Sequence, residues 1–230
     1  MIKCGVIIFP GSNCDQDLIE VLENITQTKV VKIWHKDTDL QECTHIFLPG
    51  GFSYGDYLRS GAIAKLSPVM EAVKIHANNG GFVMGICNGF QILCEAGLLP
   101  GALLHNTNRQ FICSNVYIKA VNSSSLSKNI DTSKALKIPI AHGEGNYYAD
   151  EATLASLETN KQIIFKYTDE KGAVNEGANP NGSIKNIAGI CNKEKNVFGM
   201  MPHPERASSN VLFNTDGLHI FESIFALNYA

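Results

Sequence analysis

The stretch GFVMGICNGFQILCEAG (residues 81–97) places a buried strand directly before a helix. Its first part, GFVMGI (81–86), is a short apolar run of the kind found in strands that are covered on both faces. A helix is expected from Asn88 onward, and Gly97 ends it. A strand that turns sharply into a helix is the unit from which α/β sheets are built.

The same alternation runs outward through the first hundred residues. Strands are expected at 2–9, 29–34 and 45–51, and helices at about 12–26 and 60–78. The S-x-x-D pattern that begins at Ser12 predicts an N-cap there for the first helix. Strands that alternate with helices predict an α/β fold with a doubly wound, mostly parallel central sheet flanked by helices.

The second half of the chain has more strands and fewer helices. The sequence predicts a last helix at about 216–227, and ANPNGS (178–183) is expected to be a surface loop. Without an internal repeat or a linker, we expect a single domain over residues 1–230, with extra antiparallel strands in this half. The expected strands are 111–120, 136–141, 162–168, 187–191 and 196–201.

The amino-acid composition argues against some classes of function. The 230 residues are 44% hydrophobic and 18% charged, with a net charge of -3, which supports a sizeable core. No cluster of lysine and arginine stands out, so we expect neither a nucleic-acid partner nor a membrane surface. The first apolar run ends at Pro10 and Gly11, too early for a secretion signal or a membrane span. We therefore expect a cytoplasmic protein.

The seven cysteines form no C-x-x-C pair. This spacing predicts no metal site, and a disulfide framework is not expected in a chain of this length. Six of the cysteines, Cys94 among them, are expected to be small buried hydrophobes. The seventh, Cys87, has a setting that favours chemistry.

Cys87 stands in G-I-C-N-G (85–89), which has the form G-x-nucleophile-x-G at a strand-to-helix turn. The start of a helix favours the thiolate, which is the attacking species. The backbone N–H of Asn88 and the glycines at 50–51 offer donors for an oxyanion hole. A buried cysteine that only packs at the start of a helix explains this motif equally well.

A nucleophilic thiol needs a base, and two histidines lie beside a carboxylate. His203 and Glu205 stand in M-M-P-H-P-E-R, where the prolines on both sides of His203 are expected to hold the segment extended. Residues two apart in an extended segment point the same way, so Glu205 would orient the His203 ring. His142 and Glu144 have the same spacing and form a rival dyad.

The sequence resembles the class I, triad-type glutamine amidotransferases, whose signature is a G-x-C-x-G-x-Q elbow with a late H-P-E. It is most similar to the glutaminase subunits of bacterial phosphoribosylformylglycinamidine synthase, and the shared motifs run from the first strand to the last helix. These motifs are FPGSNCD (9–15), LPGGFSYGDYLRSGAIA (48–64), GICNGFQIL (85–93), PIAHGEGNYYAD (139–150), ANPNGS (178–183), NIAGICN (186–192) and MMPHPERA (200–207).

The resemblance implies a role for each site residue. Cys87 would attack the side-chain amide of glutamine, with His203 as acid and base and Glu205 as its orienter. The N–H groups of Gly51 and Asn88 would form the oxyanion hole. Gln91 would frame the glutamine pocket, and the backbone of His142, Gly143 and Glu144 would contact the amino-acid end of the substrate.

The resemblance also implies partners. Ammonia would pass to a synthetase subunit that uses ATP and magnesium, and a small third subunit would bridge the two. No cofactor is expected on this chain, which also lacks a G-x-x-x-x-G-K-[ST] phosphate loop.

Two alternatives stay open at this point. One is another cysteine hydrolase of the same fold, such as a protease or deglycase, although these usually carry a histidine where this chain has Asn88. The other is a non-catalytic regulatory module that kept the fold.

Overall fold

The computed structural model describes residues 2–56, 59–122 and 127–226, and the chain divides into two compact units. The first unit comprises Met1–Leu99 with Asn196–Gly199, and the second comprises Pro100–Lys195 with Met200–Ala230. The single domain over residues 1–230 stays a prediction. Across the ranges that the structure describes, no helix combines the length and the apolar character needed to cross a membrane.

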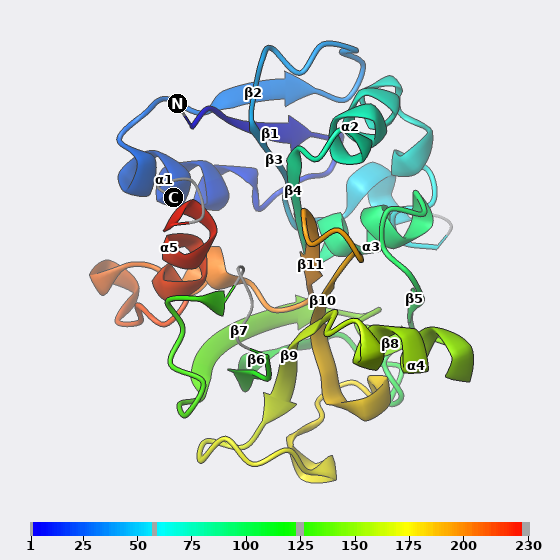
Figure 1. Ribbon diagram of the computed structural model, residues 1–230, viewed down its shortest axis with the longest axis vertical. Coiled ribbons are helices and arrows are strands. Elements are labelled where there is room, and N and C mark those ends of the chain that lie inside the picture. Colours follow the sequence, from blue (N-terminus) through cyan, green and yellow to red (C-terminus); the bar gives the residue numbers. More distant parts are fainter. Residues whose placement is uncertain (1, 57–58, 123–126, 227–230) are drawn as a thin grey trace. The chain divides into compact units, whose positions relative to one another are not determined.

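In the first unit strands and helices alternate along the chain, as the sequence predicts. Its parallel strands follow the order β2-β1-β3-β4, with β11 beside β4 (Figure 1). The elements are β1 (Cys4–Ile8), α1 (Asp15–Thr26), β2 (Val31–Trp34), β3 (His45–Leu48), α2 (Pro68–Asn78), β4 (Phe82–Ile86), α3 (Asn88–Glu95) and the first three residues of β11 (Val197–Met200).

The strand order switches between β1 and β3, because β2 lies on one side of β1 and β3 lies on the other. Open α/β sheets bind ligands beyond the carboxyl ends of the strands at such a point. The two loops that leave these strands are joined by backbone hydrogen bonds here. The N–H of Phe52 donates to the carbonyl of Gly11 (2.9 Å), and that of Tyr54 donates to Pro10 (2.7 Å). At the carboxyl ends of β1 and β3, the two loops are therefore connected to each other.

Two local predictions in this unit are wrong. The helix expected at 60–78 begins only at Pro68, because Ser67 is extended (φ -65°, ψ 141°), and a residue before proline avoids the helical region. The N-cap of α1 is Cys14, which makes no side-chain cap bond, rather than Ser12. The Ser12 hydroxyl accepts instead from the N–H of Phe9 (3.2 Å), within the turn that leaves β1.

The second unit is largely antiparallel. Its strands follow the order β10-β9-β6-β7, and a separate two-stranded ribbon pairs β5 with β8. The elements are β5 (Ala102–Leu104), β6 (Ile112–Ala120), β7 (Leu136–His142), β8 (Asn146–Tyr148), α4 (Glu151–Thr159), β9 (Ile163–Thr168), β10 (Ile187–Cys191) and α5 (Leu218–Ala226).

The predicted fold class is confirmed: an α/β chain with a mostly parallel sheet and extra antiparallel strands in its second half. The five strands expected in that half are all present. The sequence analysis missed α4 and the β5–β8 ribbon. The sequence contained a signal for α4, namely the N-cap residue Asp150. Its side chain accepts from the N–H of Thr153 (2.7 Å).

Burial of the cysteines follows the prediction with one clear exception. Cys4, Cys14, Cys43 and Cys191 are buried, and Cys94 is half-buried. Cys113 is exposed on β6, so it is not the small core residue that was expected. Burial raises the pKa of the Cys94 thiol, which therefore stays protonated at neutral pH.

Gly89 lets α3 pack directly on the end of β3. A Cβ at this position would overlap the carbonyl oxygen of Leu48, with the carbonyl carbon of the same residue 2.7 Å away. Both obstacles are backbone atoms, so no rotamer change can relieve the overlap. The second glycine of the G-x-C-x-G pattern is therefore required by packing.

Gly89→Ala is expected to destabilise the protein by about 3 kcal/mol, because overpacking against backbone outweighs the higher helix propensity of alanine. Urea denaturation measures the effect. Gly177→Ala is the matched control, since its Cβ would approach nothing closer than 3.4 Å and its stability should stay within about 0.5 kcal/mol of wild type. Equal stability of the two variants would contradict the packing argument.

Candidate active site

Cys87 forms a strained elbow between β4 and α3. Its backbone angles are φ 51° and ψ -106°, a region that side-chain-bearing residues rarely adopt. The strand ends at Ile86 and the helix begins at Asn88, so Cys87 stands at the helix N-terminus. Strain held at one residue by rigid elements on both sides marks functional positions, and here it falls on the predicted nucleophile.

The N–H group of Gly51, in the loop after β3, is available. The N–H groups of Phe52, Tyr54 and Gly55 donate to backbone carbonyls, and that of Ser53 donates to the Asn88 side chain. Within the described part of the chain, the N–H of Gly51 donates to no acceptor. Gly51 has φ 139°, and a Cβ there would lie 2.7 Å from the amide nitrogen of Asn13. Glycine is therefore needed at the residue whose N–H is predicted to bind the oxyanion.

The side chain of Asn88 ties this loop to the elbow. Its Oδ1 accepts from the N–H of Ser53 (3.1 Å), and its Nδ2 donates to Oε1 of Gln91 (2.8 Å). As the first residue of α3, Asn88 also has a backbone N–H without a partner inside the helix. Asn88 thus offers one predicted oxyanion donor and holds the loop that offers the other. Gln91 fixes the Asn88 amide.

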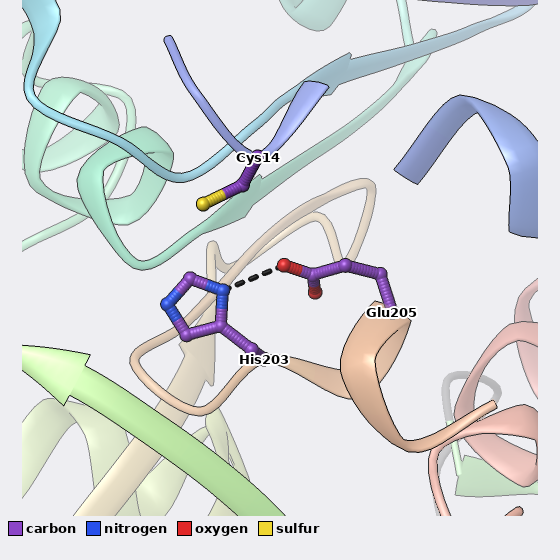
Figure 2. Close-up of side chains that lie close together, drawn as sticks. All are labelled: Cys14, His203 and Glu205. Atoms are coloured by element: carbon purple, nitrogen blue, oxygen red, sulfur yellow. Dashed lines mark hydrogen bonds and ion pairs between the residues drawn. The ribbon is translucent and has the colours of Figure 1, made fainter. Parts of the chain in front are cut away.

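In the second unit His203 and Glu205 are paired. Figure 2 shows the Nδ1 of His203 bonded to Oε1 of Glu205, and the two atoms are 2.6 Å apart. Both side chains are buried, with about 2% of each residue or less exposed. A carboxylate accepts from Nδ1–H, which leaves Nε2 as the nitrogen that can exchange a proton with a thiol. The predicted base and its orienter are therefore together.

The reason for this pairing differs from the predicted one. Glu205 lies in a 3-10 turn, Pro204–Ala207, with proline at its first position, rather than in an extended segment. His203 precedes the turn, and its N–H donates to the carbonyl of Pro139 on β7 (2.8 Å). The turn brings Glu205 back toward the ring that β7 holds.

His142 is held in one neutral form by two buried amides. Oδ1 of Asn106 accepts from the N–H of Gly145 (3.0 Å), so it also faces Nδ1 of the ring as an acceptor (3.2 Å). Nδ2 of Asn181 donates to the carbonyl of Gly145 (2.9 Å) and faces Nε2 (3.4 Å). The ring therefore carries its proton on Nδ1. Burial, and then the charge of His203, lower the pKa of His142 to about 4.

Glu144 is not the orienter of His142. Both nitrogens of the His142 ring face amides, and Oε1 of Glu144 lies 3.4 Å from Nδ1 of His105. These contacts favour the pair His203 and Glu205 over the rival dyad. The carbonyls of His142 and Gly143 accept from Asn106, at 2.9 Å each. Substrate binding by His142, Gly143 and Glu144 stays a prediction.

The structure groups the predicted residues by unit. Gly51, Cys87, Asn88 and Gln91 belong to the first unit, and His142, Gly143, Glu144, His203 and Glu205 belong to the second. The action of His203 on Cys87 stays a prediction. The sequence analysis missed Asn106 and Asn181. The motif ANPNGS contained a signal for the latter, but Asn181 is fully buried rather than part of a surface loop.

The chain belongs to the family of CobB/CobQ-like glutamine amidotransferase domains, whose model matches residues 2–221. Among named relatives, phosphoribosylformylglycinamidine synthase subunit PurQ of Koribacter versatilis is 55% identical over 96% of both chains. A chain of the structure of PurLQS from Thermotoga maritima is 38% identical, with a TM-score of 0.85 over 98% of both chains.

A more distant likeness concerns the fold alone. A glutamine amidotransferase from Thermotoga maritima is 15% identical, with a TM-score of 0.58 over 96% of this chain and 90% of the other. Together these comparisons confirm the family to which the sequence motifs point. The chain is a glutamine amidotransferase subunit with the fold of that family.

Stability is expected to fall between pH 7 and pH 5 partly through His142. In the unfolded chain this ring binds a proton below about pH 6.5, whereas in the folded chain its pKa is about 4. The unfolded state therefore binds more protons in this window, and acid favours it, by about 2 kcal/mol at pH 5. His142→Asn keeps a donor toward Asn106 and should remove this part of the pH dependence.

The free energy of unfolding, measured with urea at pH 7 and pH 5, tests this expectation. Gly177→Ala is the control, because it leaves every histidine in place and its Cβ would approach nothing closer than 3.4 Å. It should keep the wild-type difference between the two pH values. An unchanged difference in His142→Asn would mean that the ring is not held neutral.

Proposed function

We propose that this chain is the glutaminase subunit of a phosphoribosylformylglycinamidine synthase. It hydrolyses glutamine to glutamate and ammonia, and the ammonia serves a synthetase subunit of the same complex in purine biosynthesis. The observation that carries the proposal is the strained Cys87 elbow in a chain that matches PurQ subunits along its whole length. Strain of this kind is maintained where a nucleophile must be presented.

In the first half of the reaction Cys87 forms a covalent intermediate. Its sulfur attacks the side-chain amide carbon of glutamine while Nε2 of His203 takes the thiol proton. The carbonyl oxygen becomes negative and accepts from the N–H groups of Gly51 and Asn88. His203 then gives the proton to the departing nitrogen, which leaves as ammonia, and a glutamyl thioester remains on Cys87.

In the second half water resolves the thioester. His203 removes a proton from the water, whose oxygen attacks the thioester carbon. The same two N–H groups hold the oxygen of the second tetrahedral intermediate. When this intermediate collapses, the carbon–sulfur bond breaks, glutamate leaves and the proton returns to Cys87. The Glu205 side chain holds the imidazolium that forms in each half.

Substrate recognition is assigned to both units. Gln91 acts through Asn88, whose amide it fixes at 2.8 Å. The backbone at His142, Gly143 and Glu144 contacts the amino-acid end of glutamine. Asn106 already occupies the carbonyls of His142 and Gly143, so the contacts that we assign to the substrate are N–H groups of this segment, which suit a carboxylate.

The partners follow from the fate of ammonia. A synthetase subunit that binds ATP and magnesium consumes it, and a small bridging subunit joins the two, in the cytoplasm. This part of the proposal is supported by the similarity to a chain of PurLQS from Thermotoga maritima. The chain itself needs no cofactor for the chemistry above.

Cys87→Ala is expected to abolish glutamine-dependent amidine formation by the reconstituted complex and to leave ammonia-dependent formation near wild type. The reason is that the synthetase site lies on another chain. Cys94→Ala is the matched control: it removes the second thiol of the same helix and should keep both activities, at a stability cost of about 1 kcal/mol.

The assay compares amidine production with glutamine or ammonium as nitrogen source. A glutamine-mimicking diazoketone, followed by peptide mapping, should label Cys87 in the wild-type complex. Loss of ammonia-dependent activity in a well-folded Cys87→Ala complex, or labelling elsewhere, would contradict the assigned role.

Glu205→Gln is expected to lower kcat for glutamine hydrolysis on the order of 100-fold, with a small change in KM. The amide of the substituted side chain can donate to Nδ1 of His203. The ring proton then sits on Nε2, where it prevents His203 from accepting the thiol proton. Steady-state kinetics measure the effect. Glu222→Gln, which alters an exposed carboxylate on α5, is the control, and an equal loss there would argue against the orienting role.

A further inference from the structure

The side chain of Tyr54 ties the oxyanion loop to two other segments of the first unit. Its hydroxyl lies 2.6 Å from Nδ1 of His35 and 2.8 Å from the hydroxyl of Ser67. His35 directly follows β2, and Ser67 directly precedes α2. One phenol thus joins the loop after β3 to the end of a strand and to the start of a helix.

Two locally unfavourable features are found at the residues that share the Tyr54 hydroxyl contact. Ser67 occupies the N-cap of α2 with a side chain suited to capping, yet it makes no cap hydrogen bond. Tyr54 adopts left-handed angles (φ 59°, ψ 23°), which are unfavourable for an aromatic residue. Both conformations are explained by the hydrogen bonds that they make possible.

His35 is a rigid anchor for Tyr54. Its N–H donates to the carbonyl of Ile8 (3.0 Å), and its carbonyl accepts from the N–H of Val69 (3.2 Å). Burial lowers the pKa of the ring, so it is neutral at pH 7. The neutral ring pairs with the Tyr54 hydroxyl through Nδ1, and the same hydroxyl pairs with that of Ser67.

The anchored residue is close in sequence to the oxyanion donor. Ser53, next to Tyr54, donates its N–H to the Asn88 amide at the elbow (3.1 Å). Gly51 lies two residues before Ser53, and the N–H groups of Phe52 and Tyr54 are bonded to the loop after β1. With these bonds in place, the loop has little freedom to move the Gly51 N–H away from the elbow.

We infer that Tyr54, together with His35 and Ser67, positions the Gly51 N–H for the oxygen of the tetrahedral intermediate. These three are positioning residues, because they act through the loop and not on the substrate. The inference rests on the proposed glutaminase function. It assigns a role to hydroxyl groups that the reaction itself does not use.

Tyr54→Phe and Ser67→Ala test the inference by removing one hydroxyl each. Glutamine hydrolysis is measured with the full chain in the presence of the synthetase and bridging subunits. We expect kcat to fall about 10- to 100-fold in Tyr54→Phe and less in Ser67→Ala, because a displaced donor loses part of its stabilisation of the transition state. KM should stay within about threefold, since the substrate amide carries no full charge before attack.

An aldehyde analogue of glutamine supplies a second readout. The Cys87 thiol adds across its carbonyl, and the resulting thiohemiacetal oxygen occupies the oxyanion hole. In Tyr54→Phe its inhibition constant should rise by the same factor by which kcat/KM falls, while the affinity for glutamate changes little. A general loosening of the unit would weaken both ligands alike.

Thr44→Val is the matched control. The Thr44 hydroxyl lies 2.9 Å from Nδ1 of His45, so this variant also breaks a hydroxyl–histidine bond of the first unit, but at the amino end of β3. It should lower stability and leave kcat unchanged. Comparable kcat loss in Thr44→Val, or a wild-type kcat in Tyr54→Phe, overturns the inference.

The same measurements separate the inference from the function on which it rests. A wild-type complex that releases no ammonia from glutamine would overturn the proposed function and the inference with it. An active wild type beside an equally active Tyr54→Phe overturns the inference alone.

Discussion

The contact between Gly89 and the end of β3 is the constraint on which the elbow depends. Because residue 89 has no Cβ, α3 can begin directly against the carbonyl of Leu48, and Cys87 must then turn from strand to helix in a single residue. That turn forces the left-handed φ of 51°. It also leaves the first N–H of the helix, on Asn88, without a helical partner. The strain at Cys87 and the position of one proposed oxyanion donor thus share one cause.

In the second unit, the groups around His203 limit the positive charge near its ring. His203 must become an imidazolium in each half of the proposed reaction, and a second cation nearby would oppose that change. His142 is near enough for the charge of His203 to lower its pKa, and it is held neutral by amides that face both its nitrogens. Glu205 meanwhile supplies the opposite charge at 2.6 Å. Glu205 thereby offsets part of the cost of the positive charge that His203 gains in each half of the proposed reaction.

Sequence patterns predicted those parts that depend on local rules. Apolar runs located the strands, and the G-x-C-x-G spacing located the elbow. What the patterns missed depends on contacts between distant segments. Ser12 is expected to cap α1, and Ser67 is found at the N-cap of α2, but each hydroxyl serves another partner, the N–H of Phe9 and Tyr54 respectively. Asn181 lies in a motif with the composition of a surface loop, but the ring of His142, the carbonyl of Gly145 and the hydroxyl of Tyr167 bury it. The composition of a segment does not show such partners.

Three buried asparagines show why amides, and not charged groups, connect segments within each unit. Asn88, Asn106 and Asn181 are each at most 1% exposed, and each is bonded to groups of other segments. An amide both donates and accepts, so one side chain can satisfy an N–H of one loop and a carbonyl or ring nitrogen of another. A carboxylate or ammonium in the same places would be costly to bury and would shift the proton affinities of the thiol and the imidazole. The asparagine amides fix the geometry without adding charge, and Glu205 is the carboxylate paired with His203.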